Sequence, residues 1–347
     1  MQILILVDLH RVSYKLIAEL YRHILVSLGY DASIFKTPTS AVEREQITSL
    51  TKPTSVIIHI TIGESFIPIK GAYNIAQPWH EWSRFPENWI RLLNNYDEVW
   101  SISDHISELL KKSGLENHIE IISPELVPEE IPKKTSWMNS SPTRFYFVGE
   151  PHFRKGNHIL MQGFIKAFPQ IGDAQLTIKT SPSCEWESPR KDIVLIKEFW
   201  EREKLLAEYS KHDCFVSASL AEGLGLPIAE AIKARTPICT NYWGGHKSLL
   251  KKNNFIEIDH EETYQVFTSN PEFYSEDQKC AYSSPSSVSQ ALLKFCTLDE
   301  KEKANLVQCA YQHLERNYGQ EISALRVRER LQDIKSKLSS DNQPVSD

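Results

Sequence analysis

Residues 213–237, DCFVSASLAEGLGLPIAEAIKARTP, contain the pattern that decides the fold. The apolar run at 214–217 predicts a short buried strand, and the loop that follows carries two glycines, Gly223 and Gly225. Pro227 stands at the expected first position of a helix, where proline is favoured because its missing N–H would have no partner there. The stretch therefore predicts a strand, a glycine-bearing loop and a helix in direct succession.

Two carboxylates flank this turn: Glu222 lies in the loop, and Glu230 lies eight residues later, about one turn into the helix. The glycines allow a ligand to approach the backbone closely, since no Cβ blocks it. The helix start offers unpaired N–H groups and the positive end of the helix dipole, which suit a phosphate or a sugar oxygen. The same spacing also fits an ordinary strand-to-helix connection with a glutamate in the first turn of the helix. Spacing alone leaves both interpretations open.

The sequence EGLGLPIAE, within SLAEGLGLPIAEAIKARTPI, resembles the signature of retaining glycosyltransferases with two Rossmann-like domains (the GT-B fold). It is most similar to glycosyltransferase family 4, also known as glycosyl transferases group 1. The resemblance implies that Glu230 holds the ribose hydroxyls of a sugar nucleotide. It also implies that Glu222 and the loop amides after it contact the donor sugar. The loop residues concerned are Gly223, Leu224, Gly225 and Leu226.

A second loop, GEPHFRKG at 149–156, follows another predicted strand. Its adjacent cations, Arg154 and Lys155, could neutralise a diphosphate, whereas a solvated turn before a helix is the alternative. The loop resembles the Gly-Arg…Lys-Gly element of the family, which implies that Gly149, Arg154 and Lys155 bind the donor. Glu150 stands where the family usually has the arginine. Either Arg154 substitutes for that arginine, or the diphosphate is held more weakly.

Two further segments are expected at the same cleft. His80 ends a strand of the first half, and the resemblance implies that it contacts the donor sugar. Alternatively, His80 is an ordinary polar residue at the surface or in the core. Glu81, beside it, is the other candidate for a polar role at the site. Gly244 and Gly245 follow the strand after the helix of Glu230. They could let backbone amides approach the donor, or they could form a simple turn.

Nearby aromatic residues and one arginine complete the pattern. The tryptophans within a 22-residue stretch fit either a platform for a saccharide acceptor or the domain core, and they are Trp79, Trp82, Trp89 and Trp100. Arg235 stands where the family usually has the glycine that closes the helix. We expect this departure to affect backbone geometry more than chemistry.

Apolar strands alternate with helices along the whole chain, which predicts an α/β protein with two doubly wound parallel sheets facing across a cleft. The proline-rich stretch 124–142 reads as the linker between them. We predict, among other elements, a strand at 2–7, a helix at 198–209 and a strand at 236–240. The predicted units are a Rossmann-like acceptor domain (1–138), a donor domain (139–318), a helix that packs back on the first domain (319–338) and a flexible tail (339–347).

Composition limits the classes of function. With 347 residues and a net charge of −6, the chain is long enough for two domains and disfavours nucleic-acid binding. The start of the sequence lacks the pattern of a signal peptide, no apolar run reaches membrane-spanning length, and no Cys-x-x-Cys pair occurs. These features predict a cytoplasmic protein with reduced thiols. Neither Asp-x-Asp nor a metal-ligand spacing of histidines occurs, so we expect no metal.

Taken together, the residues and the resemblance predict a metal-independent retaining hexosyltransferase, with Glu222, His80 and Lys155 as its catalytic residues. The donor would be a UDP- or GDP-linked sugar, with no other cofactor, and the acceptor a saccharide or a lipid-linked saccharide. The implied context is bacterial polysaccharide or glycolipid assembly, and a lipid-linked acceptor would place the enzyme at the inner face of the membrane. Acidic residues outnumber basic ones in 1–140, however, which gives no sign of a basic membrane-docking face.

Two other functions compete with this prediction. A degenerate GT-B protein would bind a sugar nucleotide or a partner without turnover, and Glu150 at the usual arginine position favours it. A nicotinamide-dependent oxidoreductase is disfavoured, because no Gly-x-Gly-x-x-Gly follows the first strand.

Overall fold

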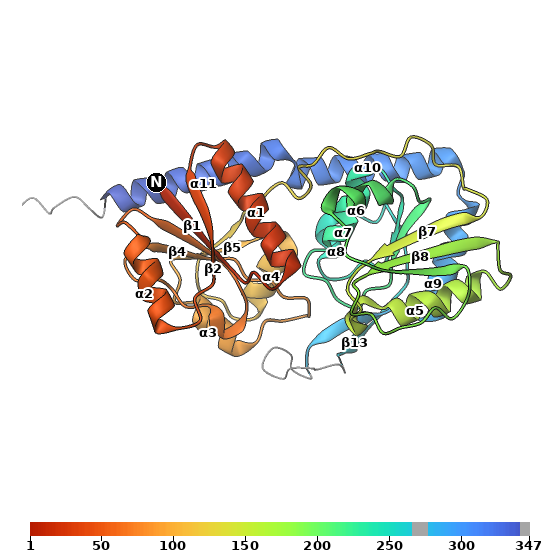
Figure 1. The fold of residues 1–347 in the computed structure, drawn as a ribbon, viewed down its shortest axis with the longest axis horizontal. Coiled ribbons are helices and arrows are strands. Elements are labelled where there is room, and N and C mark those ends of the chain that lie inside the picture. The colour runs from red at the N-terminus through yellow and green to blue at the C-terminus, as the bar shows by residue number, and fades with distance from the viewer. Residues whose placement is uncertain (266–276, 341–347) are drawn as a thin grey trace, which may run out of the picture.

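The computed structural model describes residues 1–265 and 277–340, which form two α/β domains side by side (Figure 1). The first domain is built on a 6-stranded parallel sheet in the order β2-β1-β3-β4-β5-β6. Its elements are β1 (Gln2–Val7), α1 (Val12–Ser27), β2 (Asp31–Lys36), α2 (Ala41–Leu50), β3 (Val56–Ile60), the short 3-10 helix η1 (Gly63–Ser65), β4 (Tyr73–Ala76), α3 (Glu87–Leu93), β5 (Glu98–Ser101), α4 (Asp104–Lys112) and β6 (Ile119–Ile121).

Local sequence explains the first elements. Apart from Gln2, β1 is buried throughout, as expected for a parallel strand covered on both faces. The apolar positions of α1 face the sheet, and the helix ends before Gly29, whose φ of 82° lies in the left-handed region. Ser103 caps α4 by accepting a hydrogen bond from the N–H of Ile106. Propensity, capping and burial therefore agree in this domain.

The second domain holds another 6-stranded parallel sheet, in the order β12-β11-β10-β7-β8-β9. Its elements are β7 (Thr143–Val148), η2 (Phe153–Lys155), α5 (Asn157–Ala167), β8 (Ala174–Thr180), β9 (Ile193–Lys197), α6 (Arg202–Tyr209), β10 (Cys214–Ser217), α7 (Leu226–Lys233), β11 (Ile238–Thr240), α8 (His246–Leu249), β12 (Ile256–Glu257), α9 (Pro285–Thr297) and α10 (Glu300–Tyr318). A small antiparallel pair, β13 (Glu261–Tyr264) and β14 (Lys279–Tyr282), is added to it. Both sheets confirm the predicted fold class.

The strand order of the second sheet reverses between β7 and β10, which is the switch point where open α/β sheets bind ligands. The loops that leave the carboxyl ends of these two strands are joined there. The N–H of Leu220 donates to the carbonyl of Arg154 at 2.8 Å, and the Ser219 hydroxyl donates to the same carbonyl at 3.2 Å. The topology thus brings together the two loops that the sequence singled out.

The last two helices connect the domains (Figure 1). Helix α10 packs on α7 and α8, whereas α11 (Gln320–Ser340) crosses to the first domain and contacts α1. Arg330 of α11 bonds to Glu98, which is fully buried at the start of β5. The apolar side of α11 buries Val327, Leu331 and Ile334, while Leu325 points to solvent. Most of the predicted tail, 341–347, lies outside the described residues.

Three predicted boundaries were wrong. The helix predicted at 198–209 begins at Arg202. Residues 198–201 lie outside the helix, and there the indole N–H of Trp200 donates a hydrogen bond to the Glu198 carboxylate. Helix α7 begins at Leu226, so Pro227 is its second residue, where a missing N–H is still tolerated. The strand predicted at 236–240 begins at Ile238, because the N–H of Thr236 still closes α7. Elements α2, α3, α8, β6, β12, β13 and β14, and the short helices η1 and η2, were not predicted.

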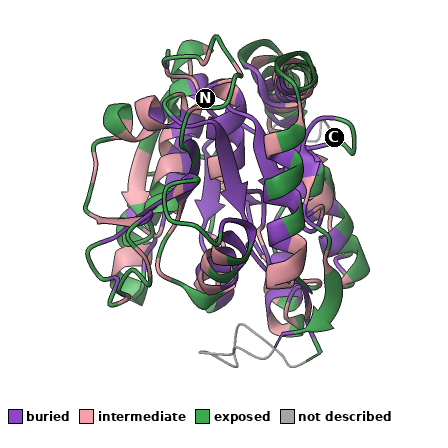
Figure 2. Cartoon of the chain, turned by 90° about the vertical axis from the view of Figure 1, so that its right-hand side faces the viewer, coloured by how far each residue is buried: buried purple, intermediate pink, exposed green. Residues whose placement is uncertain are grey.

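The core lies between the sheets and their covering helices, whose outer faces stay exposed (Figure 2). Trp82, Trp89 and Trp100 are at most 3% exposed and belong to the core, which decides the tryptophan alternative for these three. Trp79 is only half-buried. No helix within the described ranges is both long and apolar enough to cross a membrane.

Candidate active site

The loop of Glu222 is fixed by close backbone packing with the loop after β11. The carbonyl of Glu222 accepts a hydrogen bond from the N–H of Gly245 at 2.7 Å. A Cβ on Gly245 would lie 2.4 Å from the backbone of Gly223 and Leu224, so only glycine fits there. Gly244, at φ 56°, makes the turn that delivers Gly245. The paired glycines therefore bring two loops into contact, beyond forming a simple turn.

The carboxylate of Glu222 holds both predicted cations. Its Oε1 accepts from Lys155 Nζ at 2.6 Å and from Ser219 Oγ at 2.8 Å, and its Oε2 accepts from Arg154 Nη1 at 3.2 Å. Burial opposes ionisation, but Lys155 and Arg154 outweigh it and lower the pKa of Glu222 well below its usual value. The group is therefore a carboxylate at neutral pH, locked in a charged cluster at the switch point.

The β7 loop delivers these cations through a tight turn. Gly156 has a φ of 66°, and a Cβ there would lie 2.0 Å from the carbonyl oxygen of Ala218. A Cβ on Gly149, at the start of the loop, would lie 2.9 Å from the ring of Phe147 and 3.6 Å from the side chain of Lys155, which leaves little space for a side chain. The close approach of the β7 loop to Ala218 thus requires glycine at 156, and Gly149 leaves room for the Phe147 ring.

Glu150 is exposed and lies outside the cluster around Glu222. Its charge acts on Lys179, at the end of β8, whose pKa burial lowers. Within the described residues, no ion pair joins Glu150 to Arg154 or Lys155. Arg154, four residues on, is the arginine that reaches the cluster.

The first domain contributes a carboxylate to the same cluster. Glu81 Oε1 lies 3.2 Å from Arg154 Nη2, so Arg154 bridges carboxylates of both domains. Burial tends to raise the pKa of Glu81, but nearby charges, chiefly that of Arg154, outweigh it, so the pKa lies below its ordinary value. Glu81, the alternative to His80 in the sequence analysis, therefore forms a direct ion pair with Arg154 of the cluster.

His80 is buried at the junction of the domains. Its ring packs near Phe85 and Trp89, and its Nε2 accepts a hydrogen bond from the side-chain amide of Gln278 at 2.9 Å. Burial lowers the pKa of His80 to about 4, so the ring is neutral at pH 7. Its carbonyl oxygen lies 3.1 Å from the Cβ position of Gly223. The structure thus brings His80 to the Glu222 loop through its backbone.

Glu230 lies in a separate cluster one turn into α7. It is 5% exposed, with Oε1 bonded to Arg202 Nη1 at 2.8 Å and Oε2 accepting from the Tyr209 hydroxyl at 2.6 Å. Arg202 also binds Glu129 of the interdomain linker. Buried and with one partner on each oxygen, Glu230 is a rigidly held carboxylate that keeps unused acceptor lone pairs. Gly225, at φ 95°, starts α7 between the two glutamates.

Sequence reasoning missed several residues that surround the predicted site residues. Ser219 had a local signal, since it stands three residues before Glu222 at the end of a strand. Arg202, Tyr209, Glu129 and Gln278 reach the site from distant parts of the chain, and no short-range pattern marks them. Leu224 is buried and Leu226 is partly buried. The side chains of these two predicted site residues therefore pack in apolar surroundings, in addition to the donor contacts predicted for their backbone amides.

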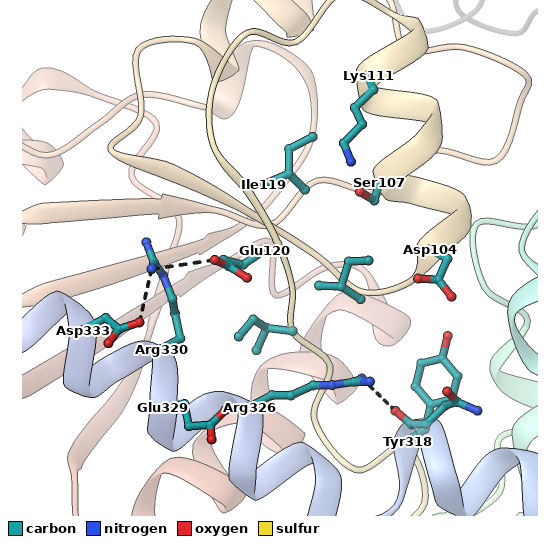
Figure 3. Close-up of a pocket in the computed structure, with 13 residues that line it drawn as sticks. Asp104, Ser107, Lys111, Ile119, Glu120, Tyr318, Arg326, Glu329, Arg330 and Asp333 are labelled. Carbon is teal, nitrogen blue, oxygen red and sulfur yellow. Dashed lines mark hydrogen bonds and ion pairs between the residues drawn. The ribbon is translucent and has the colours of Figure 1, made fainter.

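A cavity of about 410 Å³ lies elsewhere, between α4, β6 and the crossing from α10 to α11. Figure 3 shows Arg330 held there by Glu120 and Asp333, with Lys111 and Arg326 on opposite sides. Within the described part of the chain, none of the predicted site residues lines it. Among the same residues, no group of three or more His, Cys, Asp and Glu side chains could hold a metal ion.

Comparison with known families places the similarity in the second domain. Residues 142–266 match the family described as glycosyl transferases group 1. This range contains Arg154, Lys155, Glu222 and Glu230, and it leaves the first domain unmatched. No curated protein matches the sequence.

Solved structures resemble both domains together. A TarM variant of S. aureus, in complex with fondaparinux, alpha-GlcNAc-glycerol and UDP, has 13% identity and a TM-score of 0.63, over 84% of this chain and 58% of that one. A glycosyltransferase from Rickettsia africae has 13% identity and a TM-score of 0.67, over 96% and 98%. HepE of Anabaena, in complex with UDP and glucose, has 12% identity and a TM-score of 0.65, over 96% and 100%.

These comparisons show the architecture. The chain spans about three fifths of the length of TarM and of pneumococcal GtfA, another similar structure, but nearly all of the other two. At such low identities the likeness concerns the fold, and with two parallel sheets facing each other this is the GT-B fold.

Proposed function

We propose that the protein is a retaining glycosyltransferase of family 4, which moves a hexosyl group from a nucleotide sugar to a saccharide acceptor. The observation that carries this proposal is the cluster at the switch point of the second sheet. Two cations from the β7 loop and Glu222 from the β10 loop meet there, and Glu230 follows on the next helix. The match to glycosyl transferases group 1 covers all of these residues.

Each group has a role suited to its chemistry. Arg154 offers a planar fork and Lys155 a point charge for the diphosphate, close to the start of α7. Glu230, held by Arg202 and Tyr209, accepts the ribose hydroxyls. Glu222 and the amides of residues 223–226 contact the donor sugar, and His80 meets it from the first domain. The base would be uracil or guanine; the neighbours TarM, GtfA and HepE were each solved with UDP.

In the proposed reaction, the bond between the anomeric carbon and the diphosphate oxygen breaks while the acceptor hydroxyl oxygen bonds to the anomeric carbon from the same face. The hydroxyl proton passes to the departing phosphate oxygen. Arg154 and Lys155 stabilise the negative charge that develops on the diphosphate. The proposal needs no bound metal and no further cofactor. Resemblance to family 4 supports front-face attack with retention.

The cellular setting belongs to the same proposal. A family of this kind implies assembly of bacterial polysaccharide or glycolipid in the cytoplasm, where a lipid-linked acceptor would be met at the inner face of the membrane. The neighbour TarM was solved with alpha-GlcNAc-glycerol and GtfA with GlcNAc, which favours a saccharide acceptor here.

A second candidate is a GT-B protein that binds a sugar nucleotide without turnover. Two observations favour it: Glu150 replaces the usual arginine, and both cations are already paired with carboxylates. The second candidate predicts donor binding without release of the nucleoside diphosphate, which separates it from the transferase.

A thermal-shift panel of UDP, GDP, CMP, ADP and their sugar conjugates, with and without EDTA, tests the proposal. A ligand at about 100 times its dissociation constant adds roughly 2.7 kcal/mol to the free energy of unfolding, which a melt detects. One EDTA-insensitive stabiliser is expected, and the corresponding sugar nucleotide should release its diphosphate in the presence of a saccharide acceptor. No stabilisation by any member would contradict the proposal, and binding without release would favour the second candidate.

A further inference from the structure

The guanidinium of Arg154 lies between carboxylates from two domains. Nη1 is 3.2 Å from Glu222 Oε2, and Nη2 is 3.2 Å from Glu81 Oε1. The exposed fractions of the side chains are 14% for Arg154, 13% for Glu222 and 30% for Glu81. Glu222 is tied to the second domain, whereas Glu81 belongs to the first. The pair formed by Arg154 and Glu81 therefore spans the cleft.

This pair lies within a larger contact between the domains. The Gln278 amide donates to His80 Nε2 and to the carbonyl of Arg84, and the N–H of Lys279 donates to the Ser83 hydroxyl. The segment from His80 to Arg84 thus lies against β14 on one side and Gly223 on the other. Hydrogen bonds of the neighbouring residues His80, Ser83 and Arg84 therefore hold the segment that places Glu81 beside Arg154.

The charges of the described residues disfavour this arrangement when a donor is bound. Arg154 and Lys155 are balanced by Glu81 and Glu222, while His80 is neutral. A diphosphate adds further negative charge, and like charges at such distances repel. We therefore expect one carboxylate to give up its cation when the diphosphate binds.

Of the two carboxylates, Glu81 is the one free to leave. The Glu222 carboxylate is also held by Lys155 and Ser219, and its backbone is held by Gly245. Glu81 is more exposed, and among the described residues its one ion pair is that with Arg154.

We propose that Glu81 is a positioning residue of the donor site, which holds the Arg154 guanidinium in the empty cleft until the donor diphosphate takes its place. The inference rests on the proposed function, because it requires a nucleoside diphosphate at Arg154. Glu81 competes with the diphosphate and thereby weakens donor binding. It also keeps Arg154 oriented when no donor is present, and it makes release of the product diphosphate easier.

Glu81→Gln removes the competing charge while keeping the size of the side chain. Because a competing state lowers apparent affinity by the fraction of competent protein, this variant should bind UDP or GDP about five- to tenfold more tightly than the parent. Glu81→Asp, which keeps the charge on a shorter stem, should fall between them. Glu45→Gln, at an exposed glutamate of α2, is the control for net charge and should bind like the parent.

Isothermal titration with UDP and GDP measures these affinities, and melting curves establish that each variant is folded. If Glu81 acts through Arg154, the gain from Glu81→Gln should disappear when Arg154→Gln is also present. A general loosening of the cleft would instead affect both backgrounds equally, and that result overturns the inference.

The outcomes separate the inference from the function on which it rests. Binding by the parent with equal or weaker binding by folded Glu81→Gln overturns the inference alone. Failure of the parent to bind any nucleoside diphosphate overturns the proposed function, and the inference falls with it. Tighter binding by Glu81→Gln that depends on Arg154 supports both.

Discussion

The two sheets have the same architecture but very different switch points. In the first domain the order changes between β1 and β3, and the loop after β1 carries a solvent-exposed ion pair, Asp8 with Arg11, and the exposed side chain of Leu9. In the second domain the switch point holds a largely buried cluster around Glu222. Topology therefore supplies a crevice in both, and the side chains of the loops decide which crevice concentrates charge.

The largest effect is expected from breaking the second cluster. Glu222→Gln leaves Lys155 and Arg154 largely buried without their shared carboxylate, so the free energy of unfolding should fall by about 2–3 kcal/mol, below the range for a fully buried pair because the group is partly exposed. Urea denaturation at pH 7 measures it. An unchanged midpoint would show that the cluster contributes nothing to stability and would remove the contrast between the two switch points.

The next effect concerns nucleotide binding. Glu230→Ala removes the rigid acceptor of the ribose hydroxyls, and the affinity for the preferred nucleotide should fall about tenfold or more. The control is Glu203→Ala, an exposed glutamate of α6 near Arg202. Equal affinity of Glu230→Ala and the parent in titration calorimetry would refute the ribose assignment.

A smaller effect is expected from pH, through His80. Its folded pKa of about 4 lies below the usual value of 6.5, so the unfolded chain takes up a proton first as pH falls. The contribution of neutral His80 to stability is thus fully present above pH 6.5 and is lost between pH 6.5 and about 4. Between pH 6.5 and 5.5, the parent should lose about 1 kcal/mol more than His80→Gln in urea melts. Parallel pH profiles would place His80 in solvent and not at the domain junction.

The smallest effect belongs to the first switch point. Asp8→Asn breaks an exposed ion pair with Arg11, whose contribution to stability is expected to stay below about 0.5 kcal/mol. The same urea titration used for Glu222→Gln provides the measurement. A loss as large as that of the Glu222 variant would make the two switch points energetically equivalent.

The sequence predicted the fold well because its signals are local and redundant. Apolar strands that alternate with helices pointed to a parallel α/β architecture, and the capping serine of α4 and the glycine after α1 agree with it in the structure. Short or polar elements such as α2 and β13 were not predicted, since their apolar residues do not recur at a regular helical or strand spacing. Arg235, at a helix end where glycine is usual, has a φ of 60° and stacks over Tyr311, so a tertiary contact offsets an unfavourable backbone.

The site was predicted only in part. Glu222 and Glu230 stand in one recognisable motif, and adjacency on the chain made Arg154 and Lys155 visible. Which group pairs with which depends on loop packing and on contacts between domains, such as Arg154 with Glu81. Such pairs are separated by many residues, and no pattern in a single sequence reports them.

The bond between Arg330 and Glu98 has a consequence for biosynthesis. Glu98 is fully buried and accepts from Tyr73, Trp100 and Arg330, the last of which lies 232 residues further along the chain. At ordinary rates of translation the arginine follows the glutamate out of the ribosome by about 10–50 s. Throughout that interval the residues of the first sheet are present without the counter-ion of Glu98. The domain that is synthesised first is therefore the one completed last.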